Sequence, residues 1–393
     1  MLLCLRMPDP IHKISPLAHQ LGFVLIGVAR LEPLEDRRAF YTGWLAAGNH
    51  GEMAYLGRDP ERRFDPRRLD PRLRAVVSLA YPYQAPSGAP LDWKLELRGR
   101  IAAYAAGDDY HERVLGAARQ VAEAMQRLRP GALCRTYVDT GPVFEREWAA
   151  AAGLGWFGRN TMMLNARAGS YFFLAEIFTD IDFGAAAVPY RPHCGKCRRC
   201  IEQCPTGALG DGNGMDARLC ISYLTIEHRG PIAPEMRAKL GNWIFGCDIC
   251  QEVCPFNATG ADAGYGAPGE RLWPRLAEIM TLDDEGFRRR FAHNAVKRAK
   301  RRGLLRNAAV ALGNSGNPEA VGILTRTLRQ EPEALVRAHA AWALGALGDA
   351  QARGALCHAL GSEPDPEVRR EIIMALDGAY VRSCAAEAPQ RNS

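Results

Sequence analysis

The chain has 393 residues, of which 47% are hydrophobic and 24% charged, and its formal net charge is +6. This composition is typical of a soluble globular protein with two to four domains, and so mild a charge identifies no partner by itself. The longest apolar runs, such as YFFLAEIF (171–178), are far too short to cross a bilayer, so we expect no membrane association.

The first residues and the cysteine content together predict the compartment. The N-terminal MLLCLRMPDP lacks the basic region, the full apolar core and the cleavage site of a signal peptide, so we expect a cytoplasmic protein. Twelve cysteines in that compartment are not expected to form structural disulfides. Metal or redox chemistry explains them better.

Residues 1–185 alternate between strand-like and helix-like segments, which predicts an α/β domain. GFVLIGVA (22–29), AVVSLAY (75–81) and SYFFLAEIFTD (170–180) are apolar runs typical of buried strands. YHERVLGAARQVAEAMQRL (110–128) has the spacing of an amphipathic helix. The order of the strands in the sheet is not predicted.

A ferredoxin-type domain is expected at residues 186–260. HCGKCRRCIEQCPTGAL (193–209) has the C-x2-C-x2-C-x3-C-P spacing of a bacterial ferredoxin loop. Three of its thiolates can bind one cubane cluster, while the fourth points toward a second cluster. A second set of cysteines is therefore expected downstream, and GCDICQEVCPFN (246–257) supplies three more.

The second loop departs from the ferredoxin pattern because Ile244 stands where its first cysteine belongs. Cys220 is the one cysteine between the two loops, so we assign it as the missing ligand. Two structural zinc sites are the alternative, although zinc does not require the long ferredoxin spacing. The assignment gives one 4Fe-4S cluster to Cys194, Cys197, Cys200 and Cys254, and the other to Cys204, Cys220, Cys247 and Cys250.

The C-terminal part of the chain is predicted to be an all-α repeat domain. After a linker at 261–285, the Ala-Leu pairs 311–312, 343–344 and 375–376 recur about every 32 residues, an interval typical of helical solenoids. Each pair lies in what resembles the second helix of a HEAT-type unit. We expect a basic helix and HEAT-like repeats over 286–380, followed by a disordered tail at 381–393.

The segment FRRRFAHNAVKRAKRRGLLRN (287–307) contains nine Lys or Arg residues and no acid. A solvated helix face is one explanation, and binding to a phosphate backbone is the other. A second basic run at 58–74 is diluted by aspartates. Together they favour a nucleic-acid partner, and we expect backbone contacts from Lys297, Arg298, Lys300, Arg301 and Arg302.

Longer motifs resemble one enzyme family. YVDTGPVFEREWAAAAGLGWFGRNTMMLN (137–165) is similar to the D-T-G-P…E-R…A-G-L-G-W-x-G-K-N-T signature of epoxyqueuosine reductases. The segments 220–232, 241–257 and 296–317 are also similar to that family, so the resemblance covers about residues 20 to 380. Arg159 replaces the usual lysine, which keeps the charge but changes its geometry.

The resemblance implies an oxidoreductase that converts epoxyqueuosine to queuosine at the wobble position of tRNA, the last step of queuosine biosynthesis. It also implies that residues 1–185 bind cobalamin, which the two clusters supply with electrons from an external donor. We expect a monomer. The alternatives are a reductive dehalogenase-like cobalamin enzyme and a non-catalytic electron-transfer module with an RNA-binding solenoid.

The same resemblance assigns Asp139 as the proton donor to the departing epoxide oxygen, which requires a raised pKa through burial beside cofactor and base. The alternative is that the DTGPVFERE segment is only a helix start, with Pro142 in its first turn. His111 is expected to be an ordinary helix-start residue because the cobalamin-binding D-x-H-x-x-G motif is incomplete. The further candidate cofactor or substrate contacts are Arg62, Tyr104, Trp156, Phe157, Arg159, Asn160 and Ser222; the two aromatics of GLGWFGRN are equally explained as core residues.

Overall fold

The computed structural model describes residues 9–86, 92–184, 188, 190–210, 214–258 and 269–378. The predicted tail at 381–393, and the part of the predicted linker before residue 269, lie outside the described residues. The chain forms two compact units. Unit 1 comprises residues 1–85, 109–218 and 249–266, and unit 2 comprises residues 86–108, 219–248 and 267–393.

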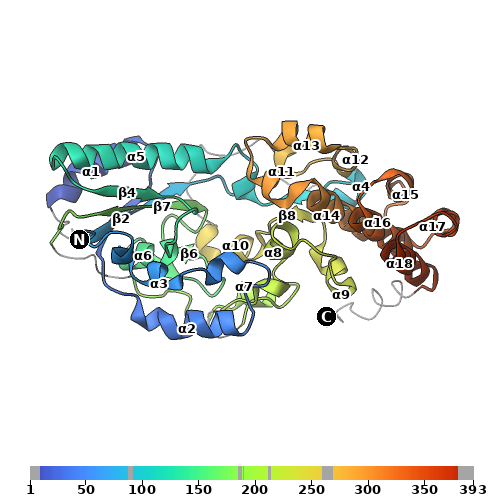
Figure 1. Cartoon of the computed structure of the whole chain (residues 1–393), viewed down its shortest axis with the longest axis horizontal. Helices are drawn as coiled ribbons and strands as arrows, with labels where there is room; N and C mark the ends of the chain where they lie inside the picture. The colour runs from blue at the N-terminus through green and yellow to red at the C-terminus, as the bar shows by residue number, and fades with distance from the viewer. Residues whose placement is uncertain are drawn as a thin grey trace. The chain divides into compact units, whose positions relative to one another are not determined.

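Unit 1 is built on a four-stranded sheet in the order β1 (Leu25–Arg30), β2 (Ala75–Pro82), β7 (Phe172–Thr179), β4 (Cys134–Tyr137) (Figure 1). Every neighbouring pair in this sheet is antiparallel. The three strands predicted from apolar runs are therefore confirmed. In the sheet β2 lies between β1 and β7. The residues of β2 are buried on both faces of the sheet.

Helices cover both faces of this sheet. On one face lie α1 (Asp9–Gln20) and α5 (Tyr110–Leu128), which confirms the predicted helix, and on the other lies α6 (Glu145–Ala151) (Figure 1). The core beneath α6 contains Trp148 and Phe178, whose rings meet edge to face. Unit 1 is completed by α2 (Glu35–Ala46), α3 (Pro60–Phe64), β5 (Trp156–Phe157), β6 (Met163–Leu164), α7 (Arg199–Glu202), α10 (Ile249–Glu252) and the 3-10 turns η1 (Ala54–Gly57), η2 (Pro66–Arg68) and η6 (Pro255–Asn257).

Unit 2 begins with a short parallel pair, β3 (Arg100–Ile101) and β8 (Trp243–Phe245). Around this pair lie α4 (Trp93–Glu96), η3 (Ala103–Ala105), α8 (Ile221–Ile226), α9 (Pro234–Arg237), η5 (Ala238–Leu240), α11 (Gly269–Leu272), α12 (Leu276–Met280) and α13 (Asp284–Phe291).

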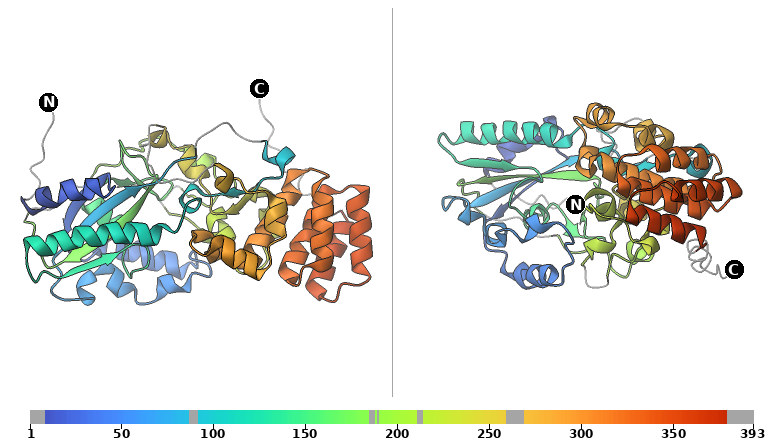
Figure 2. Two further views of the ribbon diagram at one scale, coloured as in Figure 1. Left: turned by 90° about the horizontal axis from the view of Figure 1, so that it is seen from above. Right: turned by 45° about the vertical axis from the view of Figure 1, so that its right-hand side comes forward.

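The rest of unit 2 is the predicted solenoid. The three Ala-Leu pairs lie on α14 (Lys300–Ser315), α16 (Ala334–Leu347) and α18 (Pro366–Leu376), which pack in succession, while α15 (Ala320–Gln330) and α17 (Ala350–Leu360) alternate with them. Figure 2 shows these helices as an orange-to-red stack. A Cβ at Gly313 would lie 2.8 Å from the Ala343 Cα, so only glycine permits the close approach of α14 and α16.

The basic segment 287–307 is not one helix, contrary to the prediction. It contains the end of α13, the 3-10 turn η7 (Ala295–Ala299) and the start of α14. Asn294 caps η7 by accepting a hydrogen bond from the Val296 amide, which ends the preceding helix. Lys300, the first residue of α14, adopts a positive φ of 61°. No described helix is long and apolar enough to cross a membrane.

Candidate functional site

Four cysteines from two distant segments line one pocket of unit 1. They are Cys194, Cys197, Cys200 and Cys254, the quartet assigned from the sequence to one cluster. Four thiols gathered on one pocket are the donor set that one 4Fe-4S cluster requires. Burial, then the neighbouring Cys254 and Cys194 thiols, raise the pKa of Cys200, as expected where thiols gather. The pocket therefore fits an iron–sulfur cluster.

Two residues of the segment after β5 hold the cluster loops. Arg159 Nη2 donates a hydrogen bond of 3.1 Å to the carbonyl oxygen of Gly195, and Asn160 Nδ2 donates one of 3.1 Å to that of Cys250. Both residues also line the pocket. The structure thus places two of the predicted cofactor contacts beside the thiols, where they fix the loops that carry the ligands.

The two aromatic candidates occupy different environments. Trp156 is 2% exposed and meets the rings of His193 and Phe256 edge to face at 4.9 and 5.0 Å. It therefore packs as a core residue between the two cluster loops. Phe157 is half-buried, and the Arg37 guanidinium lies 5.3 Å from its ring centre.

The second cysteine quartet stays a prediction. Cys204 and Cys250 belong to unit 1, whereas Cys220 and Cys247 belong to unit 2, and all four are half-buried. Cys134 lies on β4 and Cys357 is exposed on α17, and neither lines the first pocket. In the part of the chain that the structure describes, no three His, Cys, Asp or Glu side chains are placed to hold a single metal ion.

Asp139 lies in the loop between β4 and α6. Its φ of 56° is left-handed, a conformation that is uncommon outside glycine and that marks functional loops in many proteins. The side chain is 55% exposed, so the protein alone does not supply the burial that the sequence interpretation required. The hydroxyl of Tyr110 donates a hydrogen bond to Asp139 Oδ2, and His111 Nε2 lies 3.7 Å from the same oxygen.

The predicted helix start is present in this segment, with Glu145 and Glu147 in the first turn, but it comes after Pro142. The helix α6 begins at Glu145, with Phe144 before it, so Pro142 lies outside the helix and Asp139 does not cap it. His111, in contrast, is the helix-start residue that the sequence predicted. Asp109 caps α5, accepting hydrogen bonds from the His111 amide and, at 2.7 Å, from ring atom Nδ1.

A group of buried polar side chains lies on the α6 face of the sheet. Glu176 on β7 is opposite Ser78 on β2, and both are fully buried. The Glu176 carboxyl oxygens, Ser78 Oγ, Glu145 Oε1 and Trp148 Nε1 have no hydrogen-bond partner among the described residues. Burial raises the pKa of Glu176 well above its usual value and that of Glu145 to about 7, and the Asp139 carboxylate adds to both shifts.

The sequence interpretation missed these groups. Glu176 lies inside a run of apolar residues that predicts a buried strand. An acid in the middle of such a run was the available signal, because an unpaired carboxyl is almost never fully buried without a reason.

The Glu176→Gln variant should show a weaker dependence of stability on pH. Since folding raises the pKa of Glu176 above 4.5, its contribution to the free energy of unfolding is fully present below that pH and is lost as pH rises. The thermal midpoint of the holoprotein should therefore fall less between about pH 5 and pH 8 in Glu176→Gln than in the unmodified chain. Glu123→Gln, on the exposed face of α5, is the matched control. If the thermal midpoint fell equally in the unmodified chain, Glu176→Gln and Glu123→Gln, the raised pKa of Glu176 would be contradicted.

The other three candidate cofactor contacts lie in other elements. Arg62, in α3, is exposed and pairs with Asp59 at 2.8 Å. Tyr104 and Ser222 belong to unit 2, in η3 and in the first turn of α8. Their predicted roles as cofactor contacts stay predictions.

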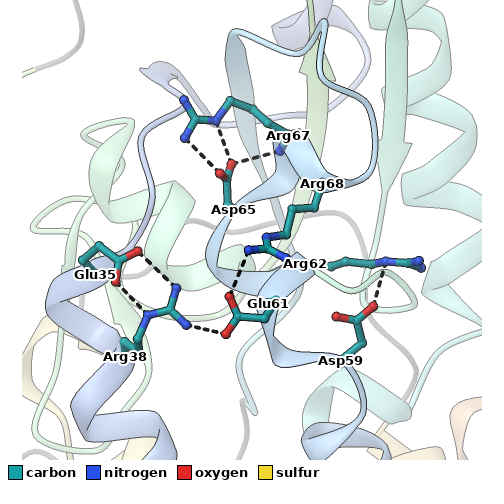
Figure 3. Close-up of polar contacts among 8 residues, drawn as sticks. All are labelled: Glu35, Arg38, Asp59, Glu61, Arg62, Asp65, Arg67 and Arg68. Carbon is teal, nitrogen blue, oxygen red and sulfur yellow. Dashed lines mark hydrogen bonds and ion pairs between the residues drawn. The ribbon is translucent and has the colours of Figure 1, made fainter.

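The basic run at 58–74 is partly neutralised by its own acids, because four of its seven arginines pair with them. Figure 3 shows Arg62 paired with Asp59, Arg67 with Asp65, and Arg68 with Glu61, across α3 and η2. The carboxylate of Asp70 likewise pairs with Arg72 at 2.9 Å. This run is therefore a weaker candidate for phosphate binding than its arginine content suggests.

The five predicted tRNA contacts differ in accessibility. Lys297, Arg298, Lys300 and Arg302 are exposed. Arg301 instead has a 12% exposed side chain that pairs with Glu331. The ion pair between Arg337 on α16 and Glu363 after α17 repeats this arrangement one repeat later, so Arg301 has a structural role in the solenoid.

Three family models match the chain. Residues 193–257 match a 4Fe-4S double cluster binding domain, 291–377 match HEAT repeats, and 63–140 match epoxyqueuosine reductase QueG, DUF1730. Among curated proteins, the epoxyqueuosine reductase of Pseudomonas aeruginosa is 38% identical over 343 residues, covering 85% of this chain and 94% of that protein. The chain belongs to the epoxyqueuosine reductase family. The enzyme of Gloeobacter violaceus is 40% identical, covering 78% of this chain and 96% of its own.

Solved structures of epoxyqueuosine reductases have the same fold. A selenomethionine-labelled enzyme superposes with a TM-score of 0.88 at 29% identity, covering 94% of this chain and 98% of its own. The Bacillus subtilis enzyme, with a TM-score of 0.86 at 28% identity and the same coverage, was captured with its catalytic aspartate loop swung out of the active site. The predicted fold class, the double 4Fe-4S domain and the HEAT-like repeats of this epoxyqueuosine reductase family member are thus confirmed.

Proposed function

We propose that this protein reduces epoxyqueuosine to queuosine in tRNA. The observation that carries the proposal is the Asp139 loop. Within a chain of this family, it presents an exposed carboxyl in a strained left-handed turn of the same unit that holds the first thiol pocket. Family membership also favours this function over a dehalogenase or a plain electron carrier.

Reduction of an epoxide to an alkene consumes two electrons and two protons and releases water. The C–O bonds of the ring break, and the departing oxygen takes up both protons. Asp139 would donate a proton from its carboxyl group, which the Tyr110 hydroxyl and His111 Nε2 approach at Oδ2. Burial raises the pKa of Glu145 to about 7 and that of Glu176 well above its usual value, so both carboxyls can hold protons near neutral pH.

We infer that cobalamin would bind in unit 1 beside Asp139, whose side chain is 55% exposed and can therefore be reached by a large cofactor. Both ring nitrogens of His111 lie against the carboxyls of Asp109 and Asp139, so His111 does not fit as a cobalt ligand. His111 would therefore stay against these carboxyls rather than bind cobalt. When bound, cobalamin would supply the two-electron reductant.

The two 4Fe-4S clusters would carry electrons one at a time toward this site. Cys194, Cys197, Cys200 and Cys254 would hold one, in the pocket that Arg159 and Asn160 brace. Cys204, Cys220, Cys247 and Cys250 would hold the other. We further propose that the protein is a cytoplasmic monomer that receives its electrons from outside the chain.

A relative of this protein was solved with an epoxyqueuosine-modified tRNA-Tyr stem loop, at 29% identity and a TM-score of 0.87. We propose that tRNA contacts the exposed cations around η7 in this chain. If so, the triple variant Lys297→Gln/Lys300→Gln/Arg302→Gln should bind tRNA more weakly and lower the slope of log affinity against log salt by about two to three. Arg326→Gln/Arg329→Gln, on exposed α15 positions of the same solenoid, is the control. A slope unchanged from that of the parent protein would exclude this surface.

The proposed function is tested by incubating the anaerobically reconstituted, reduced protein with tRNA that carries epoxyqueuosine. Nucleoside analysis should show queuosine formed in proportion to turnover. Epoxyqueuosine that stays intact with a cluster- and cobalamin-loaded protein would refute the proposal.

A further inference from the structure

Part of the lining of the first cluster pocket comes from the segment that leads into α7. Residues 190–200 contain three of the pocket cysteines. Two apolar side chains are exposed here, Val188 by 68% and Tyr190 by 38%. The exposed cations of the stretch are Arg191, Lys196, Arg198 and Arg199.

The stretch is rich in positive charge. Residues 188–200 contain four Lys or Arg and no acid, and Arg198 pairs with Glu202 at 3.7 Å. The run at 58–74 has more arginines, but it also contains four acids, and Asp59, Asp65 and Asp70 each pair with an arginine there. The stretch at the cluster pocket has no acid of its own, so the field over it is positive.

Two cations belong to the pocket itself. Arg199 and Arg159 line it together with the cysteines. The Arg159 guanidinium is anchored by its 3.1 Å bond to the Gly195 carbonyl oxygen, within the loop that carries Cys194 and Cys197. A positive charge so close to the thiol sulfurs would stabilise added negative charge on a cluster in this pocket.

We propose that Val188 and residues 190–199 form the docking surface for an acidic one-electron carrier protein that reduces the cluster held by Cys194, Cys197, Cys200 and Cys254. This inference rests on the proposed function, which needs electrons from outside the chain. In each encounter the carrier is oxidised by one electron and the cluster is reduced by one electron. No covalent bond forms or breaks.

The properties of the surface fit a transient redox partner. Electron-transfer complexes bury small interfaces, in which a few apolar contacts lie within a charged rim that speeds encounter. Val188 and Tyr190 supply apolar contacts, while the four cations supply the rim. The position beside the thiol pocket favours an electron carrier over RNA, since an RNA contact has no need of the cluster.

The test uses the cluster-loaded protein and reduced flavodoxin, an acidic one-electron carrier, as the probe. Stopped-flow bleaching of the iron–sulfur absorption gives the second-order rate of cluster reduction. The triple variant Arg191→Glu/Lys196→Glu/Arg198→Glu should lower this rate at low salt at least tenfold, and should flatten its decline with rising salt. The matched control Lys13→Glu/Arg119→Glu/Arg127→Glu, on exposed positions of α1 and α5, changes the net charge equally and should keep the parent rate.

Reduction by dithionite, a small reagent that needs no docking surface, separates docking from damage to the cluster. It should proceed equally in all proteins, and iron content should be unchanged. If the triple variant fails to assemble its cluster, Arg191→Glu/Tyr190→Ser lies outside the ligand spacing and should still slow flavodoxin at least threefold. If flavodoxin reduced the cluster of these variants at the parent rate, the proposal would be overturned. Variants that bound tRNA more weakly but were reduced by flavodoxin no more slowly would overturn it as well. Failure of the dithionite-reduced parent protein to convert epoxyqueuosine would instead refute the proposed function.

Discussion

Replacing Asp139 by Asn should lower the rate of epoxyqueuosine reduction by about 10²- to 10⁴-fold, the contribution typical of a positioned general acid. Asn keeps the shape of the side chain and tolerates the left-handed φ of 56° better than most residues, so the loop should stay folded. The amide cannot release a proton as the carboxyl does. Single-turnover reduction of tRNA-bound epoxyqueuosine measures the effect.

Iron content and tRNA affinity should be unchanged in Asp139→Asn. The matched control is Asp36→Asn on α2, an exposed acid in the same unit, and it should keep full activity. Turnover by Asp139→Asn at more than half of the parent rate would show that another group supplies the proton. Glu145 would then be the first candidate, because its pKa of about 7 suits the same task.

Replacing single cysteines should remove one cluster at a time and abolish turnover. The crossed assignment predicts that Cys254→Ala lowers iron from about eight to about four per chain and leaves the same spectroscopic signal as Cys194→Ala. Cys204→Ala should remove the other signal. Cys134→Ala and Cys357→Ala, outside both quartets, should keep all the iron.

The two quartets are distinguished by comparing these signals. If Cys254→Ala resembled Cys247→Ala rather than Cys194→Ala, each loop would hold its own cluster and the crossed assignment would be wrong. Electron paramagnetic resonance of the reduced proteins makes this comparison directly.

Local sequence patterns predicted the elements of the fold well. The helix at 110–128, the three long strands and the Ala-Leu repeat helices all depend on hydrophobic periodicity, which local sequence records. The first cysteine quartet also followed from spacing, because ferredoxin loops impose the distance between their thiolates.

The rest depends on contacts between distant residues. Nothing in the order of the segments reveals that β2 lies between β1 and β7, or that Glu176 and Ser78 face each other on that sheet. The basic segment is not one helix, because it contains a 3-10 turn that Asn294 caps. Arg301 forms an ion pair with Glu331, thirty residues away. A count of the charged residues in the sequence cannot distinguish an arginine held in a buried ion pair from one that remains exposed.

The central claim is that this chain removes one oxygen from epoxyqueuosine in tRNA, with Asp139 donating a proton. The most direct measurement is a single turnover of anaerobic, pre-reduced protein with epoxyqueuosine tRNA, followed by mass spectrometry of the released nucleosides for the parent protein and Asp139→Asn. The account predicts that the modified nucleoside loses the mass of one oxygen atom with the parent protein, and keeps it on the same timescale with the variant. An unchanged nucleoside mass with the parent protein, or equal conversion by both, would contradict it.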